Sequence, residues 1–244
     1  LQNPYDGNMM GHFAELTAQR YELSRETQDA FSRESVEWAL TADADGRFAA
    51  ELTPVTVVQR RKEHTVSRDE EPGRCDLDAI STLRPAFAKD GTVTAASSSS
   101  ISDGAASLLL MSEATATQHN LEPLARIVAQ AGHAHEPEWF TTAPVHALRK
   151  VMTAAGWETS TVDLFEINEA FACVTLAAIK ELDLERSKVN VNGGACALGH
   201  PIGASGARIL VTLVHALRQR GLRRGVATLC IGGGEAVALA VEAL

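Results

Sequence analysis

Three segments of the chain place side chains capable of chemistry beside runs of small residues. The first, residues 162–172, is an apolar strand that leads directly into a predicted helix, with Asn168 and Glu169 at the junction. An asparagine there commonly caps the helix. Its amide could instead orient a water or donate to a developing oxyanion, with Glu169 behind it tuning that site. Because ligands collect at strand ends in α/β sheets, both interpretations of Asn168 stay open.

The second segment, residues 190–208, has five glycines within fourteen residues. Glycines where a strand becomes a helix let the backbone and the helix N-terminus approach a ligand closely. The segment lacks the lysine of a P-loop and the GxGxxG spacing, so it contains no nucleotide-phosphate motif. His200 lies among these glycines, and Pro201 restricts it to extended conformations. His200 is therefore either a structural residue or a catalytic one.

The third segment, residues 226–241, consists of two apolar strands joined through Gly232, Gly233 and Gly234. The pattern predicts a buried hairpin with Cys230 where the first strand turns. A buried cysteine often acts as a small hydrophobe. Alternatively, the glycines expose backbone N–H groups beside a thiol, which suits acyl chemistry: the thiolate is a base or nucleophile and the amides hold an oxyanion.

A metal site is the weakest of the candidates. His133, His135 and Glu136 are metal-ligand types close together in the sequence, but they flank a loop containing a proline and have no second ligand cluster nearby. We therefore expect no metal site.

Periodicity predicts the elements that must position these residues. The first 75 residues contain two helices, with Ser24 as an N-cap, then a short strand and a charged stretch without periodicity. After Leu83 the chain has the alternation of a buried sheet covered by helices. The predicted helices are 11–21, 24–41, 169–182 and 205–220, the last ending at Gly221; the predicted strands are 51–58, 162–167, 189–191 and 226–231, and the charged stretch is 59–74.

Composition excludes several classes of partner. The 244 residues are 45% apolar and carry a formal net charge of -9, so a nucleic acid would be repelled. The run Arg60, Arg61 and Lys62 is either a solvated loop or a local anion-binding patch. The cysteines show no CxxC pair, and no apolar stretch reaches the roughly 18 residues of a membrane helix. We expect a cytoplasmic protein without a membrane segment. Because the chain opens at Leu1 in a polar, turn-rich stretch, we also expect the gene product to begin upstream.

Taken together and in order, the three segments resemble the C-terminal motifs of the thiolase family. The motifs are Asn168-Glu169-Ala170-Phe171, residues 199–206 (GHPIGASG) and residues 230–234 (CIGGG). Further similarity at residues 83–87, 91–95 and 103–106 extends the resemblance over nearly the whole chain.

The resemblance implies a Claisen condensation, and its reverse thiolysis, on thioesters of coenzyme A. It makes Cys230 the cysteine that abstracts a proton from the α-carbon of an acyl-CoA. His200 would activate the nucleophilic cysteine and help to form an oxyanion hole. Asn168 would position a water in that hole, and the amide of Gly232 would contribute to the hole serving the acyl-enzyme. Ser99 falls where the family has a serine touching the pantetheine arm of CoA.

The departures from the family pattern matter as much. The family's nucleophilic cysteine lies upstream of anything present here, and Cys75, Cys173 and Cys196 match no required cysteine. The chain alone should therefore lack the acylation step. It is either a portion of an acyltransferase or a remnant that binds CoA or a partner without turnover. Met9 leaves the acyl-chain length open, although residues 140–144 (FTTAP) resemble some acetoacetyl-CoA thiolases.

The implied fold is an α/β fold, the layered αβαβα arrangement of two similar halves, here an incomplete copy. Residues 1–100 would be the loop domain that covers CoA, 101–122 the end of the first core half and 123–244 the second half. The family implies a homodimer or homotetramer, CoA thioesters as substrates and no tightly bound cofactor. Without its missing partner layer, residues 101–244 should expose a sheet or helix face that is normally covered.

Overall fold

The computed structural model describes residues 1–244, and its centre is a mixed four-stranded sheet in the order β3-β6-β5-β4. Strand β4 (Leu164–Ile167) runs parallel to β5 (Arg224–Ile231), whereas β5 and β3 (Ala125–Ala134) are antiparallel to β6 (Glu235–Ala243). The predicted hairpin is confirmed, because Cys230 pairs with Ala236 and Ile231 with Glu235 on either side of the glycine turn.

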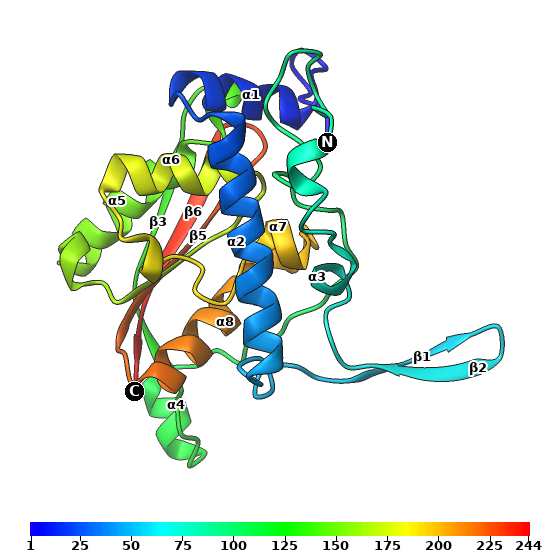
Figure 1. Cartoon of the computed structure of the whole chain (residues 1–244). Helices are drawn as coiled ribbons and strands as arrows, with labels where there is room; N and C mark the ends of the chain where they lie inside the picture. Colours follow the sequence, from blue (N-terminus) through cyan, green and yellow to red (C-terminus); the bar gives the residue numbers. More distant parts are fainter.

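Helices cover both faces of this sheet (Figure 1). Helices α5 (Ala143–Ala155) and α6 (Ala172–Leu182) pack on one face, and α8 (Ser205–Arg220) packs on the other. Alternation along β4 explains the division: Phe165 and Ile167 join the core under α5 and α6, whereas Leu164 joins the core under α8. Helix α1 (Met10–Arg20) adds a further layer over α6.

The remaining elements surround the sheet. Helix α2 (Arg25–Ala44) begins as predicted, with the Ser24 side chain accepting a hydrogen bond from the Thr27 amide. It contacts α6 and the short helix α7 (Ala195–Leu198). The other short helices are α3 (Glu71–Arg74) and α4 (Glu113–Gln118), and the 3-10 turns are η1 (Ile80–Thr82), η2 (Pro137–Trp139), η3 (Thr159–Thr161) and η4 (Arg186–Lys188).

The prediction that residues 59–74 lack regular structure was wrong. Strands β1 (Val55–Gln59) and β2 (Lys62–Val66) form an antiparallel hairpin that projects from the body of the molecule (Figure 1). Its turn residues Arg60 and Arg61 have φ of 50° and 65°, values that usually call for glycine or asparagine. The hairpin escaped prediction because its turn lacks that signal. Arg60, Arg61 and Lys62 are all exposed.

The predicted boundaries of α8 are confirmed, including Gly221, which ends the helix with a φ of 65°. The start of α6 was predicted too early. This helix begins at Ala172 with Phe171 in the cap position, so Asn168 does not cap it. The strand predicted at 189–191 is reduced to one bridge between Phe165 and Val189.

Several large apolar side chains are exposed. Leu109 and Leu110 lie in an extended segment without regular structure, and Ile127 and Val128 lie on the edge strand β3. Among the helices, none has the length and apolar character needed to cross a membrane.

Candidate active site

A pocket of about 470 Å³ brings together four of the five residues selected from the sequence. Ser99, His200, Cys230 and Gly232 all line it, although they come from distant parts of the chain. Most of the other lining side chains are apolar. They are contributed by the N-terminal segment, α1, the end of β5 and the loops around residues 87, 101, 140, 170 and 202. Such a lining around a few polar groups is typical of a small-molecule site.

Cys230 lies one residue before the end of β5, where it lines the pocket with only 8% of the residue exposed. Burial raises the pKa of the Cys230 thiol to about 12, because a thiolate loses solvation there. The resting side chain is therefore the protonated thiol. A group in this state donates a proton readily to a strong carbon base and, once deprotonated, is itself a strong base.

The glycine turn after Cys230 presents a free amide to the same pocket. Gly232 lies just past β5, and its N–H donates to no acceptor within the chain. The turn is held in place at Gly234, whose carbonyl accepts a 2.9 Å hydrogen bond from the His135 amide. Gly234 has a φ of +94°, and a side chain there would meet the His135 carbonyl oxygen. An unpaired amide facing a pocket is a donor available to an oxyanion.

His200 is held by hydrogen bonds on its backbone and its ring. Its amide donates to the Ser100 carbonyl at 2.9 Å, and its Nδ1 lies 2.5 Å from Ser205 Oγ. We assign the Ser205 hydroxyl hydrogen to the Pro201 carbonyl, 3.1 Å from Oγ, which leaves the Ser205 oxygen to accept from His200. Nδ1 therefore carries the proton, and Nε2 keeps a lone pair suited to a general base.

Burial and the positive charge of Arg208 lower the pKa of His200 below its usual value. The imidazole is thus neutral at neutral pH, which is the state a general base requires. Ser205 fixes its tautomer but was missed in the sequence, because there it is simply the first residue of a predicted helix. A hydroxyl five residues after the histidine, at a helix start, was the only signal available.

Asn168 does not line the pocket. It is 1% exposed, and neither its Oδ1 nor its Nδ2 has a hydrogen-bond partner. Its carbonyl accepts from the amide of Ala170, a residue that does line the pocket, so Asn168 lies just behind the pocket wall. A buried amide with both ends unpaired is costly unless a water or a reacting group completes it.

Ser99 also lines the pocket, but its hydroxyl is engaged. Its Oγ donates to the Ala170 carbonyl at 3.0 Å and its amide donates to the same oxygen at 3.1 Å. Its hydroxyl oxygen retains lone pairs that can accept a hydrogen bond from a ligand.

Glu169, the residue expected to tune the chemistry of Asn168, does not line the pocket and makes no hydrogen bond to the Asn168 side chain. Its carboxylate accepts hydrogen bonds from Ser35 Oγ at 2.7 Å, Asn190 Nδ2 at 2.8 Å and the Cys196 amide at 3.1 Å. Ser35 belongs to α2, so this fully buried carboxylate joins α2 to the core. Gly194 is required beside it, because a Cβ there would lie 2.2 Å from Glu169 Cδ.

None of the other three cysteines reaches the pocket. Cys173 is fully buried in α6, Cys196 donates to the Glu169 carbonyl, and Cys75 packs near α2. All are free thiols. Burial raises the pKa of Cys173, Cys196 and Cys75 above the usual range, so none has an activated thiolate.

The chain belongs to the thiolase family. Residues 1–114 match the family described as "Thiolase, N-terminal domain", and residues 121–243 match "Thiolase, C-terminal domain". An acetyl-CoA acetyltransferase from Chromobacterium violaceum is 50% identical over 99% of the chain, which covers 62% of that protein. One from Shinella zoogloeoides is 49% identical over 100% of the chain and is likewise 62% covered.

Solved structures agree. The acetyl-CoA acetyltransferase of Bacillus anthracis superposes with a TM-score of 0.98 at 47% identity, and a thiolase from Ascaris suum in complex with coenzyme A with 0.91 at 41% identity. Each is matched over 100% of this chain and 62% of its own. The α/β thiolase fold is thereby confirmed. The chain spans about three fifths of the length of these relatives.

Proposed function

We propose that this chain is the larger part of an acyl-CoA acyltransferase that condenses two acetyl-CoA molecules and cleaves the resulting 3-ketoacyl-CoA. The carrying observation is the single pocket that gathers Cys230, His200 and the free amide of Gly232. The relatives named acetyl-CoA acetyltransferase support the reaction, and the relative crystallised with coenzyme A supports the substrate class.

Cys230 is the acid/base of the reaction. In thiolysis, breaking the bond between the α and β carbons leaves a carbanion on the departing acyl-CoA. The resting thiol of Cys230 donates its proton to that carbon, and in condensation the thiolate takes a proton back from it. The pKa raised to about 12 by burial narrows the gap between the thiol and a carbon acid, which makes both transfers feasible.

His200 activates the nucleophilic thiol, and both His200 and Gly232 stabilise oxyanions. The lone pair on His200 Nε2 accepts the proton of a nucleophilic thiol, and the imidazolium so formed donates to an oxyanion. The Gly232 amide donates to the thioester oxygen of the acylated enzyme. Asn168 holds a water behind the pocket wall with its unpaired amide, and Ser99 accepts a hydrogen bond from the pantetheine arm.

The nucleophilic cysteine comes from a part of the protein not represented in this sequence. None of Cys75, Cys173 and Cys196 lines the pocket, so the chain by itself binds CoA thioesters without turning them over. This same observation favours a second candidate function, a CoA-binding or partner-binding thiolase remnant.

The preferred substrate in the thiolysis direction is acetoacetyl-CoA. Phe140, which lines the pocket, opens the segment 140–144 that resembles some acetoacetyl-CoA thiolases, and relatives of the chain are named acetyl-CoA acetyltransferases. We place the protein in the cytoplasm, because all four cysteines are free thiols. The relatives named acetyl-CoA acetyltransferase support a role in acyl-CoA and fatty acid metabolism. Exposed apolar side chains on residues 109–128 support a homo-oligomer or a covering layer from the rest of the protein.

CoA-dependent loss of acetoacetyl-CoA by the natively expressed protein tests the proposal, with intact mass measured on the same sample. A mass well above 26.0 kDa together with cleavage supports the acyltransferase. A mass near 26.0 kDa with CoA binding but no cleavage would replace it with the remnant.

A further inference from the structure

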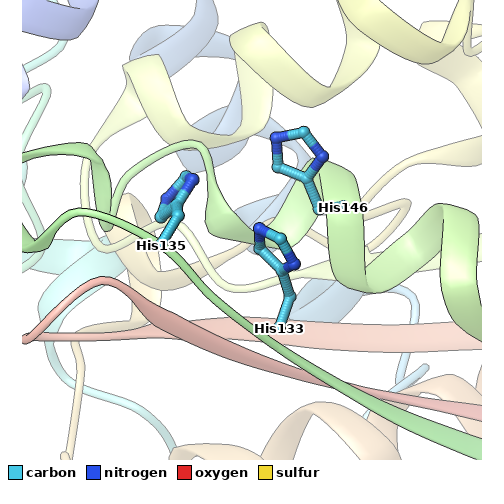
Figure 2. Close-up of side chains that lie close together, drawn as sticks. All are labelled: His133, His135 and His146. Atoms are coloured by element: carbon cyan, nitrogen blue, oxygen red, sulfur yellow. The ribbon is translucent and has the colours of Figure 1, made fainter.

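Three histidines converge on one face of the sheet, outside the pocket. His133 is near the end of β3, His135 follows that strand, and His146 lies on the first turn and a half of α5 (Figure 2). One ring nitrogen of each lies within 4.8 Å of those of the other two. The closest pair of rings, His133 and His146, has centroids 4.4 Å apart. The cluster was not expected from the sequence, because His146 is distant from the other two in the chain.

The hydrogen bond of His135 sets which of its nitrogens is free. Its Nε2 lies 2.7 Å from the carbonyl oxygen of Trp139, which can only accept, so Nε2 carries the proton. Nδ1 then keeps its lone pair. A ring nitrogen that donates to a backbone carbonyl while the other binds a metal is the usual arrangement around metal-ligating histidines.

His133 lacks the partners that a structural histidine would have. Both of its ring nitrogens are shielded from solvent, and neither has a hydrogen-bond partner. Burial also lowers the pKa of His133 and of His146, in addition to the repulsion between the neighbouring rings. A cluster of three imidazoles without a carboxylate leaves buried ring nitrogens unpaired, which is unfavourable unless a shared cation or water binds their lone pairs.

We propose that His133, His135 and His146 bind a divalent transition-metal ion of the zinc class. Three imidazole nitrogens are a known ligand set for zinc with an open fourth position. In a tetrahedral site with Zn–N of about 2.0 Å, ligand nitrogens lie about 3.3 Å apart, so each would move by about 1 Å, within reach of small side-chain rotations. Glu136 does not join the three histidines. The nearby ammonium of Lys150 is occupied with the Gly132 carbonyl at 3.2 Å.

Because of where the site lies, a bound ion should stabilise one end of the sheet. It would cross-link β3 to α5, two elements that pack together beside the glycine turn. The His135 amide donates to Gly234, so the ligand loop and the turn that carries Gly232 are joined by a hydrogen bond. Bound metal would therefore stiffen the end of the sheet where the pocket opens, as ligand binding to the native state stabilises it.

Metal titration of the untagged, chelator-treated protein tests this inference. We expect one equivalent of Zn²⁺ per chain by calorimetry, a rise in melting temperature with added Zn²⁺, and, with Co²⁺, the intense visible bands of a four-coordinate ion. His135→Ala and His146→Ala should each weaken Zn²⁺ binding by more than about tenfold. His119→Ala, which removes an exposed histidine beyond α4, is the matched control and should leave affinity unchanged.

Circular dichroism of the metal-free variants separates loss of the site from loss of the fold, and His146→Gln replaces His146→Ala if the latter misfolds. Failure of the wild-type chain to bind Zn²⁺ or Co²⁺ would overturn the inference. So would equal Zn²⁺ affinity in the wild-type protein and in folded His135 and His146 variants.

Discussion

His200 Nδ1 and Ser205 Oγ lie 2.5 Å apart, and the Ser205 hydroxyl passes its own hydrogen on to the Pro201 carbonyl. These hydrogen-bonded groups all lie within residues 200–205, at the start of α8. It fixes the imidazole tautomer that leaves the Nε2 lone pair free. Ser205 is thus a positioning residue that acts through His200.

Replacing Ser205 tests this relationship. In the natively expressed protein, Ser205→Ala should lower kcat for the proposed thiolysis by about tenfold to a hundredfold, because the tautomer and ring orientation are no longer fixed. KM should change little, and the acid limb of the pH profile should move. Thr212→Val removes another buried hydroxyl of α8, one bonded to Glu51, and should leave kcat unchanged. Equal losses of kcat in the two variants would reduce Ser205 to a structural role.

Replacing Asn168, whose side-chain amide is unpaired, should lower activity without lowering stability. Asn168→Leu keeps the volume of the side chain but removes two buried polar atoms that have no partner in the protein. The free energy of unfolding should stay the same or rise by about 1 kcal/mol. Activity should fall by about a hundredfold, because the water that we propose for the oxyanion hole would no longer be held by Asn168. Urea unfolding and steady-state kinetics measure the two, and a large loss of stability would contradict the account.

The parts of the fold that could be predicted are those with strong local signals. The range of α8 followed from its apolar spacing and from Gly221, and the β5–β6 hairpin followed from two apolar runs around three glycines. The start of α6 could not be predicted, because Ala170 and Phe171 continue the apolar pattern of the helix without being helical. The first strand of the hairpin at residues 55–66 overlaps the predicted strand 51–58, whereas the charged second strand and a turn without glycine or asparagine gave no signal.

The residues of the candidate sites likewise divide into those that could be selected from the sequence and those that could not. Cys230, His200 and Gly232 lie in glycine-rich segments and could be selected from the sequence, whereas their meeting in one pocket required the structure. Ser205 gave only the signal of a hydroxyl at a helix start after His200, and His146 gave none, because each is an ordinary residue near the start of a helix. Only tertiary packing brings them to their partners.

Two glycines of the same turn should respond differently to alanine. Gly234→Ala places a Cβ 2.2 Å from the His135 carbonyl oxygen at a φ of +94°, so it should lower the free energy of unfolding by about 2 kcal/mol or more. Gly232→Ala meets only Met10 Sδ at 3.3 Å, a flexible side chain, and should cost less than about 1 kcal/mol. Chemical denaturation of both variants is the measurement. The reverse order of stabilities would contradict the described turn.

The buried carboxyl group of Glu166 should make the stability of the protein depend on pH. Burial raises its pKa to about 8, against the opposing charge of Arg208 at 3.8 Å. Between the unfolded pKa of about 4.5 and the folded value, the folded state keeps a proton that the unfolded state has lost. This group therefore makes the protein less stable as pH rises through that window, by at most about 1.4 kcal/mol per pH unit.

Glu166→Gln should remove that contribution and flatten the dependence between pH 5 and pH 8 relative to the wild-type protein. Urea unfolding at several pH values measures the slopes. Parallel slopes for the wild-type protein and the variant would show that Glu166 is ionised in the folded state.

The most direct test of the central claim is CoA-dependent cleavage of acetoacetyl-CoA by the natively expressed protein and by its Cys230→Ala variant, with circular dichroism confirming that both are folded. The account predicts cleavage by the wild-type protein and a loss of at least about a hundredfold in the variant, because the carbanion then has no proton donor. Undiminished cleavage by the folded variant would contradict the assignment of Cys230 as the acid/base and, with it, the proposed site.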